Sequence, residues 1–386
     1  MLTLLNNFIY KINKKRLLIK GYIKSQKHYP DRFSNDPIDF VVTWVDGTDS
    51  SWEKQKQYYE SKQFSQVIDD NGEERYRNWD LFKYWFRAVE KYAPWVHKVY
   101  LVTCGHIPQW LNTESDKLVV VNHKDFIPSE YLPTFSSIPI ELNIHRISGL
   151  SEKFVYFNDD MFLTKPVLPS DFFVNGMPKY CGIAYPLKNH RENDSFQHQL
   201  FSVLGIVNDF FSSKISGIIK NNPEKWFSRE YGKALKYNMI AYEESYIQGM
   251  YFSHLGCPFR KKTFEKVWNT IPDELNKTSM HRFRMPTDIM HQVFSIWDIL
   301  DGNFYPVSAD YYGAVFASLE SQIDDISRAV LEKEYRMICI NDSRNIKQTD
   351  FEILKTRISN IMQCAFPKKS AFEIFNEEGE EHVTPN

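Results

Sequence analysis

The sequence predicts an α/β protein with a mostly parallel sheet and an α-helical insertion. In residues 35–187, short runs rich in β-branched and aromatic residues alternate with helical patterns. This alternation favours parallel strands joined by right-handed crossover connections. In residues 188–300, by contrast, helical patterns follow one another, which predicts a helical segment added to the sheet.

Each expected element follows from local composition and spacing. Strand patterns are short and bounded by turn-forming residues, and helical patterns carry apolar residues on one side. The predicted strands are residues 38–45, 99–103, 118–121, 154–157, 181–185, 304–309 and 337–340. The predicted helices are residues 52–62, 79–92, 138–150, 196–219, 226–237 and 261–268.

These elements divide the chain into five expected parts. They are a basic amphipathic N-terminal extension (1–34), an α/β core (35–187), a helical insertion that carries His254 and Arg284 (188–300), a return to the core (301–365) and a disordered acidic tail (366–386).

The overall composition argues against a general nucleic-acid binder. Lys and Arg total 47 while Asp and Glu total 49, whereas such binders need a net positive face. The five cysteines are scattered without metal-ligand spacing, which suits a reducing cytoplasm. No apolar run approaches the roughly 20 residues of a membrane-spanning helix, and we recognise no signal peptide. We therefore expect a cytoplasmic protein.

The N-terminal extension is basic, and its apolar residues fall near helical spacing. A helix of this kind can lie on the anionic inner face of the cell membrane. It can equally pack on the domain or on a partner, with its basic side in solvent. Its basic residues, all before the first acidic residue Asp31, are Lys11, Lys14, Lys15, Arg16, Lys20, Lys24 and Lys27.

Two adjacent carboxylates end the strand predicted at residues 154–157. Asn158, Asp159 and Asp160 follow it with no Lys or Arg before Lys165. Adjacent buried acids are costly unless a cation or a helix N-terminus neutralises them. Because ligands bind at the carboxyl ends of strands in α/β sheets, these acids could hold Mg²⁺ or Mn²⁺ against a diphosphate. The alternative is a turn in which an Asp caps the next element.

Other polar residues are placed where they could contact a nucleotide. Trp44 and Asp46 could bind its ribose or base, with Gly47 allowing close approach, although an Asp-Gly turn explains the same residues. Arg75 and Arg77 precede a predicted helix and suit phosphate binding, because Arg recognises phosphate with two parallel hydrogen bonds.

Spacing along the predicted helices leaves further alternatives open. Arg87 should face solvent. Glu141 and His145 lie four residues apart, either pointing into a cleft or, as we favour, forming a surface pair. Outside the predicted helices, His254 lies in a loop between aromatic segments and could be a general base or a structural residue.

Two further sets of polar residues could bind substrate or could be structural. Arg284 and Asp288 could meet a phosphate and orient a base, or could begin a helix. Asp342, like Asp46 and the paired acids, follows a strand directly and could complete a site or form a turn.

Several enzyme classes lose their main support because their motifs are missing. The sequence contains no P-loop, no nucleophile elbow and no dinucleotide-binding glycine motif. Kinase, serine hydrolase and dehydrogenase interpretations are therefore disfavoured.

Four blocks of the sequence resemble the Stealth family of polysaccharide phosphotransferases. The first contains Trp44-Val45-Asp46-Gly47, and the second ends with Asn158-Asp159-Asp160. Because large insertions are missing, the chain is most similar to bacterial capsule members. The blocks are residues 38–49, 75–166, His254 with 281–288, and 339–342.

The resemblance implies transfer of a sugar 1-phosphate from a nucleotide sugar, usually a UDP-sugar, to a glycan hydroxyl. It also implies a nucleotide-sugar-transferase-like sheet. For this reaction we expect Mg²⁺ or Mn²⁺ at Asp159 and Asp160. Catalysis is expected from His254, Arg284 and Asp288, with His254 acting as a base or as a covalent phospho-histidine. Substrate binding is expected from Trp44, Asp46, Gly47, Arg75, Arg77, His145, Asn158 and Asp342.

Two alternatives to this function remain. A metal-dependent glycosyltransferase would use a similar fold and release a nucleoside diphosphate. A non-catalytic glycan-binding protein of capsule assembly would consume no donor. The expected partners are thus a nucleotide-sugar donor and a growing polysaccharide, without nucleic acid.

Overall fold

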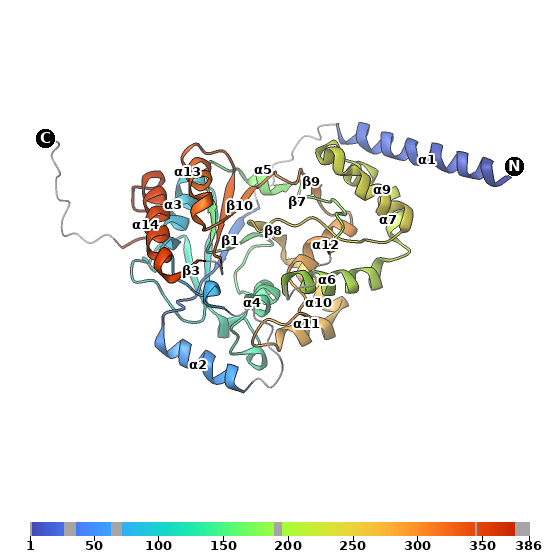
Figure 1. The fold of residues 1–386 in the computed structure, drawn as a ribbon. Coiled ribbons are helices and arrows are strands. Elements are labelled where there is room, and N and C mark those ends of the chain that lie inside the picture. The colour runs from blue at the N-terminus through green and yellow to red at the C-terminus, as the bar shows by residue number, and fades with distance from the viewer. Residues whose placement is uncertain (1, 27–35, 63–71, 189–194, 344–345, 375–386) are drawn as a thin grey trace.

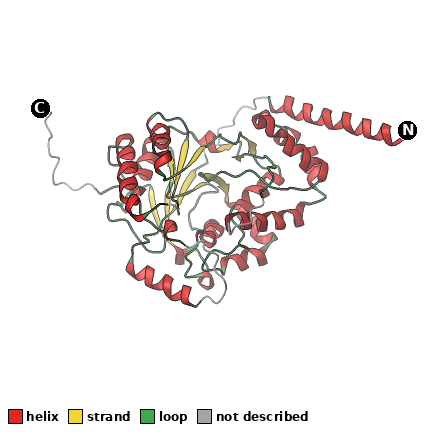
Figure 2. Ribbon diagram, viewed as in Figure 1, coloured by secondary structure: helices red, strands yellow, loops and turns green. Residues whose placement is uncertain are grey.

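A five-stranded sheet forms the centre of the protein in the computed structural model, which describes residues 2–26, 36–62, 72–188, 195–343 and 346–374 (Figures 1 and 2). Its strand order is β3-β2-β1-β4-β8, and all neighbours are parallel except β8, which runs antiparallel to β4. The predicted α/β class with a mostly parallel sheet is therefore confirmed. The strands are β1 (Ile38–Thr43), β2 (Val99–Thr103), β3 (Leu118–Asn122), β4 (Lys153–Asn158) and β8 (Cys257–Arg260).

The two faces of this sheet are covered by different elements because side chains alternate along each strand. Phe40, Val42 and Phe157 point to one face, where they pack with the helices α3 and α14. A second sheet of order β10-β11-β5 lies on the same side. The elements here are α3 (Phe82–Tyr92), α13 (Ile323–Leu331), α14 (Gln348–Ala365), β5 (Met161–Leu163), β10 (Gly313–Ala317) and β11 (Met337–Asn341).

The helical insertion covers the opposite face. Val41, Phe154 and Tyr156 share one hydrophobic core with α4 and the insertion helices, so the insertion is packed on the sheet. The predicted helix over residues 196–219 is broken, since Ser213 adopts a φ of 67°. The helices are α4 (Ser137–Asn143), α6 (Ser195–Phe211), α7 (Ile215–Asn221), α8 (Pro223–Trp226), α9 (Leu235–Glu244), α10 (Lys261–Thr270), α11 (Pro272–Ser279) and α12 (Gln292–Leu300).

The strand predicted over residues 181–185 is wrong. Asn238 takes the hydrogen bonds that a neighbouring strand would provide: its side chain accepts from Ala184 N (2.7 Å) and donates to Gly182 O (2.8 Å). The strand predicted over residues 304–309 is reduced to two residues. A small sheet here contains β6 (Phe173–Val174), β7 (Met177–Tyr180) and β9 (Tyr305–Pro306), preceded by α5 (Pro169–Phe172).

The two ends of the described chain are packed on the protein. Residues 366–374, which we assigned to an acidic tail, contain buried Phe366, Phe372 and Glu373. Residues 375–386 lie outside the described residues. At the other end, α1 (Leu2–Ser25) lies on the helical insertion, and α2 (Ser50–Ser61) follows β1. No helix of the described chain is both long and apolar enough to span a bilayer.

Candidate functional site

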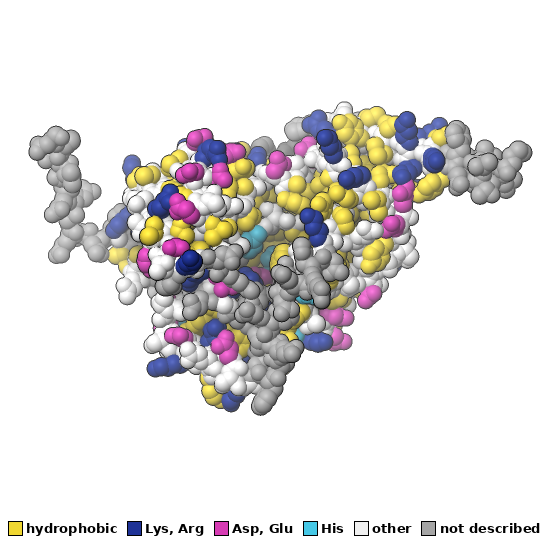
Figure 3. Space-filling view, viewed as in Figure 1, with side chains coloured by type: hydrophobic (Ala, Val, Ile, Leu, Met, Phe, Trp, Pro, Cys, Tyr) yellow, Lys and Arg dark blue, Asp and Glu magenta, His cyan; other side chains and the backbone are white. Residues whose placement is uncertain are grey.

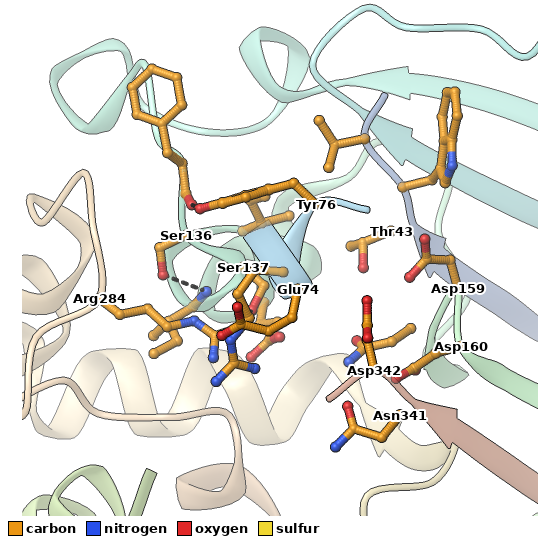
Figure 4. A pocket seen from close by; sticks show the side chains of 18 of the residues that line it. Thr43, Glu74, Tyr76, Ser136, Ser137, Asp159, Asp160, Arg284, Asn341 and Asp342 are labelled. Carbon is orange, nitrogen blue, oxygen red and sulfur yellow. Dashed lines mark hydrogen bonds between the residues drawn. The ribbon is translucent and has the colours of Figure 1, made fainter. Parts of the chain in front are cut away.

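A cavity of about 560 Å³ opens at the carboxyl ends of the central strands. Residues following β1, β4 and β11 line it together with α4, the segment around Tyr76 and the helical insertion. Its volume falls within the range of small-molecule sites, roughly 300–1,000 Å³. Figure 4 shows Asp159, Asp160 and Asp342 on one side of the space and Arg284 across from them.

Asp159 and Asp160 stand at the end of β4, in the lining of this cavity. Burial, and then the neighbouring charge of Asp160, raise the pKa of Asp159 to about 7. Oδ1 of Asp160 is buried and has no hydrogen-bond partner among the described residues. An unsatisfied carboxylate oxygen of this kind is costly, and a cation would satisfy it.

His254 and Cys339 lie against the other oxygen of Asp160. His254 Nε2 lies 3.5 Å from Oδ2, and the thiol of Cys339 donates to the same oxygen at 3.2 Å. These three side chains could each offer an atom to a metal ion. The burial of His254 lowers its pKa, but the Asp160 carboxylate more than compensates, so the pKa is raised overall.

The paired carboxylates fit a hard divalent cation. Mg²⁺ and Mn²⁺ prefer oxygen ligands and share them with phosphates. A cation would satisfy the unpartnered oxygen of Asp160 and would also stabilise the ionised form of Asp159. Cys339 is a softer donor, and its thiol is already hydrogen-bonded to Asp160. The residues present therefore suit such an ion at the two carboxylates.

Arg284 is held in the cavity wall by the loop that precedes α12. Its Nη2 donates to Ser137 Oγ at 3.2 Å. Asp288 fixes this loop, because its carboxylate accepts from Met285 N (2.8 Å) and contacts His281 Nδ1 (2.6 Å). Asp288 is fully buried and does not line the cavity, so its contacts lie within the loop that carries Arg284.

Glu141 and His291 form a second pair in the cavity wall. His291 Nδ1 lies 2.6 Å from Glu141 Oε2, and Glu141 is buried in α4. Burial would raise the pKa of Glu141, but the charge and hydrogen bond of His291, with the charge of Arg284, lower it to about 2. Glu141 is therefore ionised and offsets the cationic side chains around it.

A hydrogen-bond network joins this pair to the end of β4. The hydroxyl of Tyr156 lies 3.1 Å from Glu141 Oε1 and 2.7 Å from Asn158 Oδ1. Thr43 Oγ1 lies 3.1 Å from the same hydroxyl. Asn158 is thereby oriented beside the two carboxylates.

Arg77 and Asp342 form an ion pair across the cavity wall. Arg77 donates through Nε and Nη2 to the two oxygens of Asp342, at 2.9 and 2.8 Å. Trp79 Nε1 also donates to Asp342, at 2.9 Å. Burial raises the pKa of Asp342 in spite of these partners. The pair joins the segment that carries Arg75, also in the cavity lining, to the end of β11.

Of the predicted site residues, nine meet at this cavity: Trp44, Arg75, Arg77, Asn158, Asp159, Asp160, His254, Arg284 and Asp342. Asp46, Gly47, His145 and Asp288 are outside its lining.

Asp46 and Gly47 shape the loop after β1. Asp46 accepts from Thr48 N at 2.9 Å, which is the turn that we weighed as the alternative. A Cβ at Gly47 would lie 2.2 Å from Tyr76 O, so this glycine permits close packing of two loops.

His145 is buried away from the cavity between Phe264 and Trp268. Burial, with Arg146 nearby, lowers its pKa to about 3. Glu141 and His145 do not share a face because α4 ends at Asn143 and a 3₁₀ turn follows.

Several lining residues were not assigned from the sequence. We favoured a surface position for Glu141, and we did not assign Glu74, His291 or Asn341 to the site. The position of Asn341 next to Asp342, at the end of a predicted strand, was the one available signal. Nothing in local spacing marks His291, which meets Glu141 only through the fold.

Solved structures resemble this fold only distantly. The galactosyltransferase LgtC, in complex with donor and acceptor sugar analogs, aligns over 83% of this chain and 95% of its own. The identity is 11% and the TM-score is 0.36. The bifunctional enzyme WbbM aligns with 9% identity and a TM-score of 0.37. Neither likeness is close enough to carry a conclusion.

Curated relatives match nearly the whole chain. The capsular polysaccharide phosphotransferase WcwK of Streptococcus pneumoniae is 41% identical, covering 88% of this chain and 98% of the relative. The receptor polysaccharide phosphotransferase WefC of Streptococcus gordonii is 42% identical, covering 88% of this chain and 99% of the relative. The exopolysaccharide phosphotransferase cps2G of Lactiplantibacillus plantarum is 36% identical, covering 88% of this chain and 98% of the relative.

Three family models match the segments that build the cavity. Stealth conserved region 1 matches residues 36–63, region 2 matches residues 75–180 and region 3 matches residues 253–295. They contain, in turn, Trp44, the carboxylates after β4, and His254 with Arg284. With the full-length relatives, these matches confirm the expected resemblance: the chain belongs to the Stealth family of bacterial polysaccharide phosphotransferases.

Proposed function

We propose that the chain transfers a sugar 1-phosphate from a nucleotide sugar, in the first place a UDP-sugar, to a hydroxyl of a growing capsular polysaccharide. The acceptor oxygen bonds to the phosphorus attached to the sugar. The bond from that phosphorus to the oxygen bridging the two phosphates breaks, and UMP leaves. The product is a phosphodiester, and the hydroxyl proton passes to a base.

One observation carries this proposal: two carboxylates and an arginine face one another across a single cavity at the sheet's carboxyl edge. Phosphoryl transfer needs little covalent chemistry from the protein, so positioning and neutralisation of charge supply most of the catalysis. Asp159, Asp160 and Arg284 are the residue types that this requires. The relatives are named as polysaccharide phosphotransferases, which is consistent with it.

Asp159 and Asp160 would hold Mg²⁺ or Mn²⁺, which supplies positive charge to the diphosphate of the donor when it is bound. Arg284 would bind the phosphoryl oxygens, and Arg75 is placed to contact the same donor from the cavity wall. Trp44 lines the cavity beside Phe82, with 5.7 Å between the two ring centroids. Its ring offers a flat surface for the base of the nucleotide.

His254 would take the proton of the acceptor hydroxyl. It is open to the cavity and its pKa is raised, because the Asp160 carboxylate outweighs the effect of burial. A covalent phospho-histidine on His254 is the other route. In both, His254→Ala should lower turnover at least about a hundredfold.

We propose the cytoplasm as the place of action. All five cysteines are free thiols, from Cys104 near the cavity to Cys364 on α14, which suits a reducing compartment. Nucleotide-sugar donor and glycan acceptor are the proposed partners.

The test is incubation with a panel of nucleotide sugars and Mg²⁺, followed by mass spectrometry of nucleotide and glycan. UMP together with a phosphate-linked glycan is expected. UDP would indicate a glycosyltransferase, and no consumption of any donor by the intact chain would indicate a binding protein. Either result would overturn the proposal.

A further inference from the structure

One face of α1 is used to hold this helix on the helical insertion. Leu17 and Leu18 pack against the insertion's core. Gly21 lies so close to α8 that a Cβ there would be 2.2 Å from Pro223 O. Ser25 Oγ accepts from Arg229 N at 3.1 Å, and Lys14 pairs with Glu243 of α9. This position is thus specified by packing, hydrogen bonding and charge.

The opposite face of α1 carries an exposed apolar stripe. Ile12, Ile19 and Ile23, which we call the outer stripe, are 37%, 44% and 54% exposed. Their spacing of seven and four residues places them along one side of an α-helix. Tyr22, on the flank of this stripe, is also exposed. The outer stripe points away from the insertion, since Leu17 and Gly21 occupy the packed side.

Positive charge flanks the outer stripe on both sides. At ~100° per residue, Lys15, Arg16 and Lys20 lie within about 80° of Ile12 around the helix. All three are exposed, and the sequence of α1 contains no acidic residue. Figure 3 shows Lys and Arg side chains beside hydrophobic ones along this edge of the molecule.

We propose that the outer stripe and its basic flanks bind the surface of an anionic membrane, with α1 lying in the plane of the bilayer. The apolar side chains would enter the boundary between headgroups and acyl chains, and the basic ones would meet lipid phosphates. Tyr22, about 80° from Ile12 around the helix, suits the same boundary, where amphipathic rings are enriched.

Charge favours a membrane over a second copy of the chain. Pairing two copies through the same stripe would bring Lys15, Arg16 and Lys20 against their equivalents, and like charges in contact oppose binding. An anionic lipid surface attracts the same residues. The inference does not depend on the transferase reaction, because it uses residues far along the chain from the cavity.

The experiment is flotation of the full chain with vesicles of neutral phosphatidylcholine, with or without anionic phosphatidylglycerol. We expect binding to the anionic vesicles that weakens as salt rises. Substituting Lys15, Arg16 and Lys20 together by Gln should weaken this binding about a hundredfold, at roughly fivefold for each charge. Replacing Ile12, Ile19 and Ile23 by Gln should weaken it at least about tenfold.

A matched control removes exposed apolar residues elsewhere. Ile353→Gln on α14 and Leu331→Gln at the end of α13 alter side chains that are 60% and 46% exposed, and binding should not change. Light scattering should give the same mass for wild type and the outer-stripe variant. A fall from dimer to monomer in that variant would instead assign the face to a second copy and overturn the inference.

Equal binding to neutral and anionic vesicles, or unchanged binding by the outer-stripe variant, would also overturn the inference that α1 binds an anionic membrane. Nucleotide release with a water-soluble acceptor and without vesicles should be unchanged in every one of these variants. Loss of vesicle binding with normal release would leave the proposed reaction standing. Absence of release by a wild type that binds vesicles would contradict the reaction alone.

Discussion

Asp159 and Asp160 face Arg284 across the cavity in which we propose that a diphosphate binds. Holding two neighbouring carboxylates in a protein cavity costs free energy, and the raised pKa of Asp159 reflects this cost. Functional sites commonly retain such costly groups because the bound substrate or ion offsets them. The stability and the activity of the protein should therefore respond to these residues in opposite directions.

Asp160→Asn tests this expectation. It preserves the size of the side chain but removes its charge, so we expect turnover to fall about a thousandfold. The melting temperature should not fall, because the repulsion between Asp159 and Asp160 is removed. Steady-state kinetics and thermal unfolding measure the two effects. Glu265→Gln, an exposed change on α10, is the control, and turnover of Asp160→Asn within threefold of it would contradict the assignment.

Glu141→Gln tests the second pair of the cavity. Because the pKa of Glu141 is about 2, its carboxylate is charged at every practical assay pH, and Gln removes that charge from beside His291 and Arg284. We expect kcat/KM to fall about a hundredfold. Far-UV circular dichroism should remain that of the wild type. A variant with kcat/KM within twofold of wild type would remove Glu141 from the site.

Sequence patterns predicted the strand-end acids better than the helical residues. A polar residue that directly follows a buried strand lies at the sheet's edge, so the order of residues predicted Asp159, Asp160 and Asp342 in the site. Asp46 follows a strand in the same way but lies outside the cavity lining. Helical spacing predicts which residues neighbour Glu141 on the helix. It does not predict whether that side of the helix faces the cavity or solvent. The 3₁₀ turn after α4, which separates Glu141 from His145, leaves no clear mark in the sequence.

Loops between elements set the geometry of the cavity. The loop before α12 places Arg284 because buried Asp288 holds it through His281 and Met285. We expected Asp288 among the catalytic residues, and in the structure it lies outside the cavity lining, in contact with His281 and Met285. The loop after β1 and the segment around Tyr76 similarly depend on each other, through the close approach at Gly47.

Gly47→Ala should disturb that second contact. The added Cβ would lie 2.2 Å from Tyr76 O, so the backbone must shift, and we expect a loss of about 2 kcal/mol in the free energy of unfolding. Activity should also fall because Arg75 and Arg77 flank Tyr76. Urea unfolding and kinetics measure these effects.

Gly205→Ala in α6 is the matched control for this substitution. Apart from its chain neighbours and the backbone of the same helix, no described atom lies within 4 Å of the Cβ that it adds. Alanine also favours a helix over glycine by roughly 1 kcal/mol. We expect it to be neutral or stabilising. Equal stability of the two variants would show that the contact between Gly47 and Tyr76 is not tight.

Residues 366–374 join the C-terminal part of the described chain to the core. Arg87 of α3 donates through Nε and Nη2 to both oxygens of Glu373, at 2.8 and 2.7 Å, and both side chains are buried. We expected Arg87 to face solvent and this segment to be a tail. Both errors have one cause: the partner that buries Arg87 lies 286 residues away in sequence.

Glu373→Gln should destabilise the protein by about 3 kcal/mol at pH 7, because it leaves a buried arginine without its counter-charge. Burial acts to raise the pKa of Glu373, but Arg87 and Ser370 lower it below its usual value of 4.5. The carboxylate therefore contributes stability above pH 4.5, and this contribution is lost as the pH falls through the depressed pKa.

Urea unfolding of wild type and variant at pH 7 and at pH 4 or below would measure this dependence. The difference between the two proteins should shrink at the lower pH. A constant difference would mean that the pKa of Glu373 is not depressed. Gln363 also contacts Arg87, at 3.2 Å, and stays in place in both proteins.

The arrangement of the whole molecule was predictable where the chain repeats strand and helix, and less so where segments distant in sequence meet. The parallel order of β1 to β4 follows from crossover connections between them. The second sheet could not be predicted in the same way, because β5 precedes the helical insertion in sequence and its partner β11 follows it. That sheet nevertheless brings Asn341 and Asp342 to the cavity.

The most direct measurement follows one oxygen atom. A UDP-sugar labelled with ¹⁸O between the sugar carbon and its phosphorus is incubated with the protein, Mg²⁺ and a glycan acceptor, and the products are weighed by mass spectrometry. Transfer of a sugar 1-phosphate leaves that oxygen in the glycan and releases unlabelled UMP. Label recovered in released UDP would mean that the bond to the sugar carbon breaks, and would contradict the account.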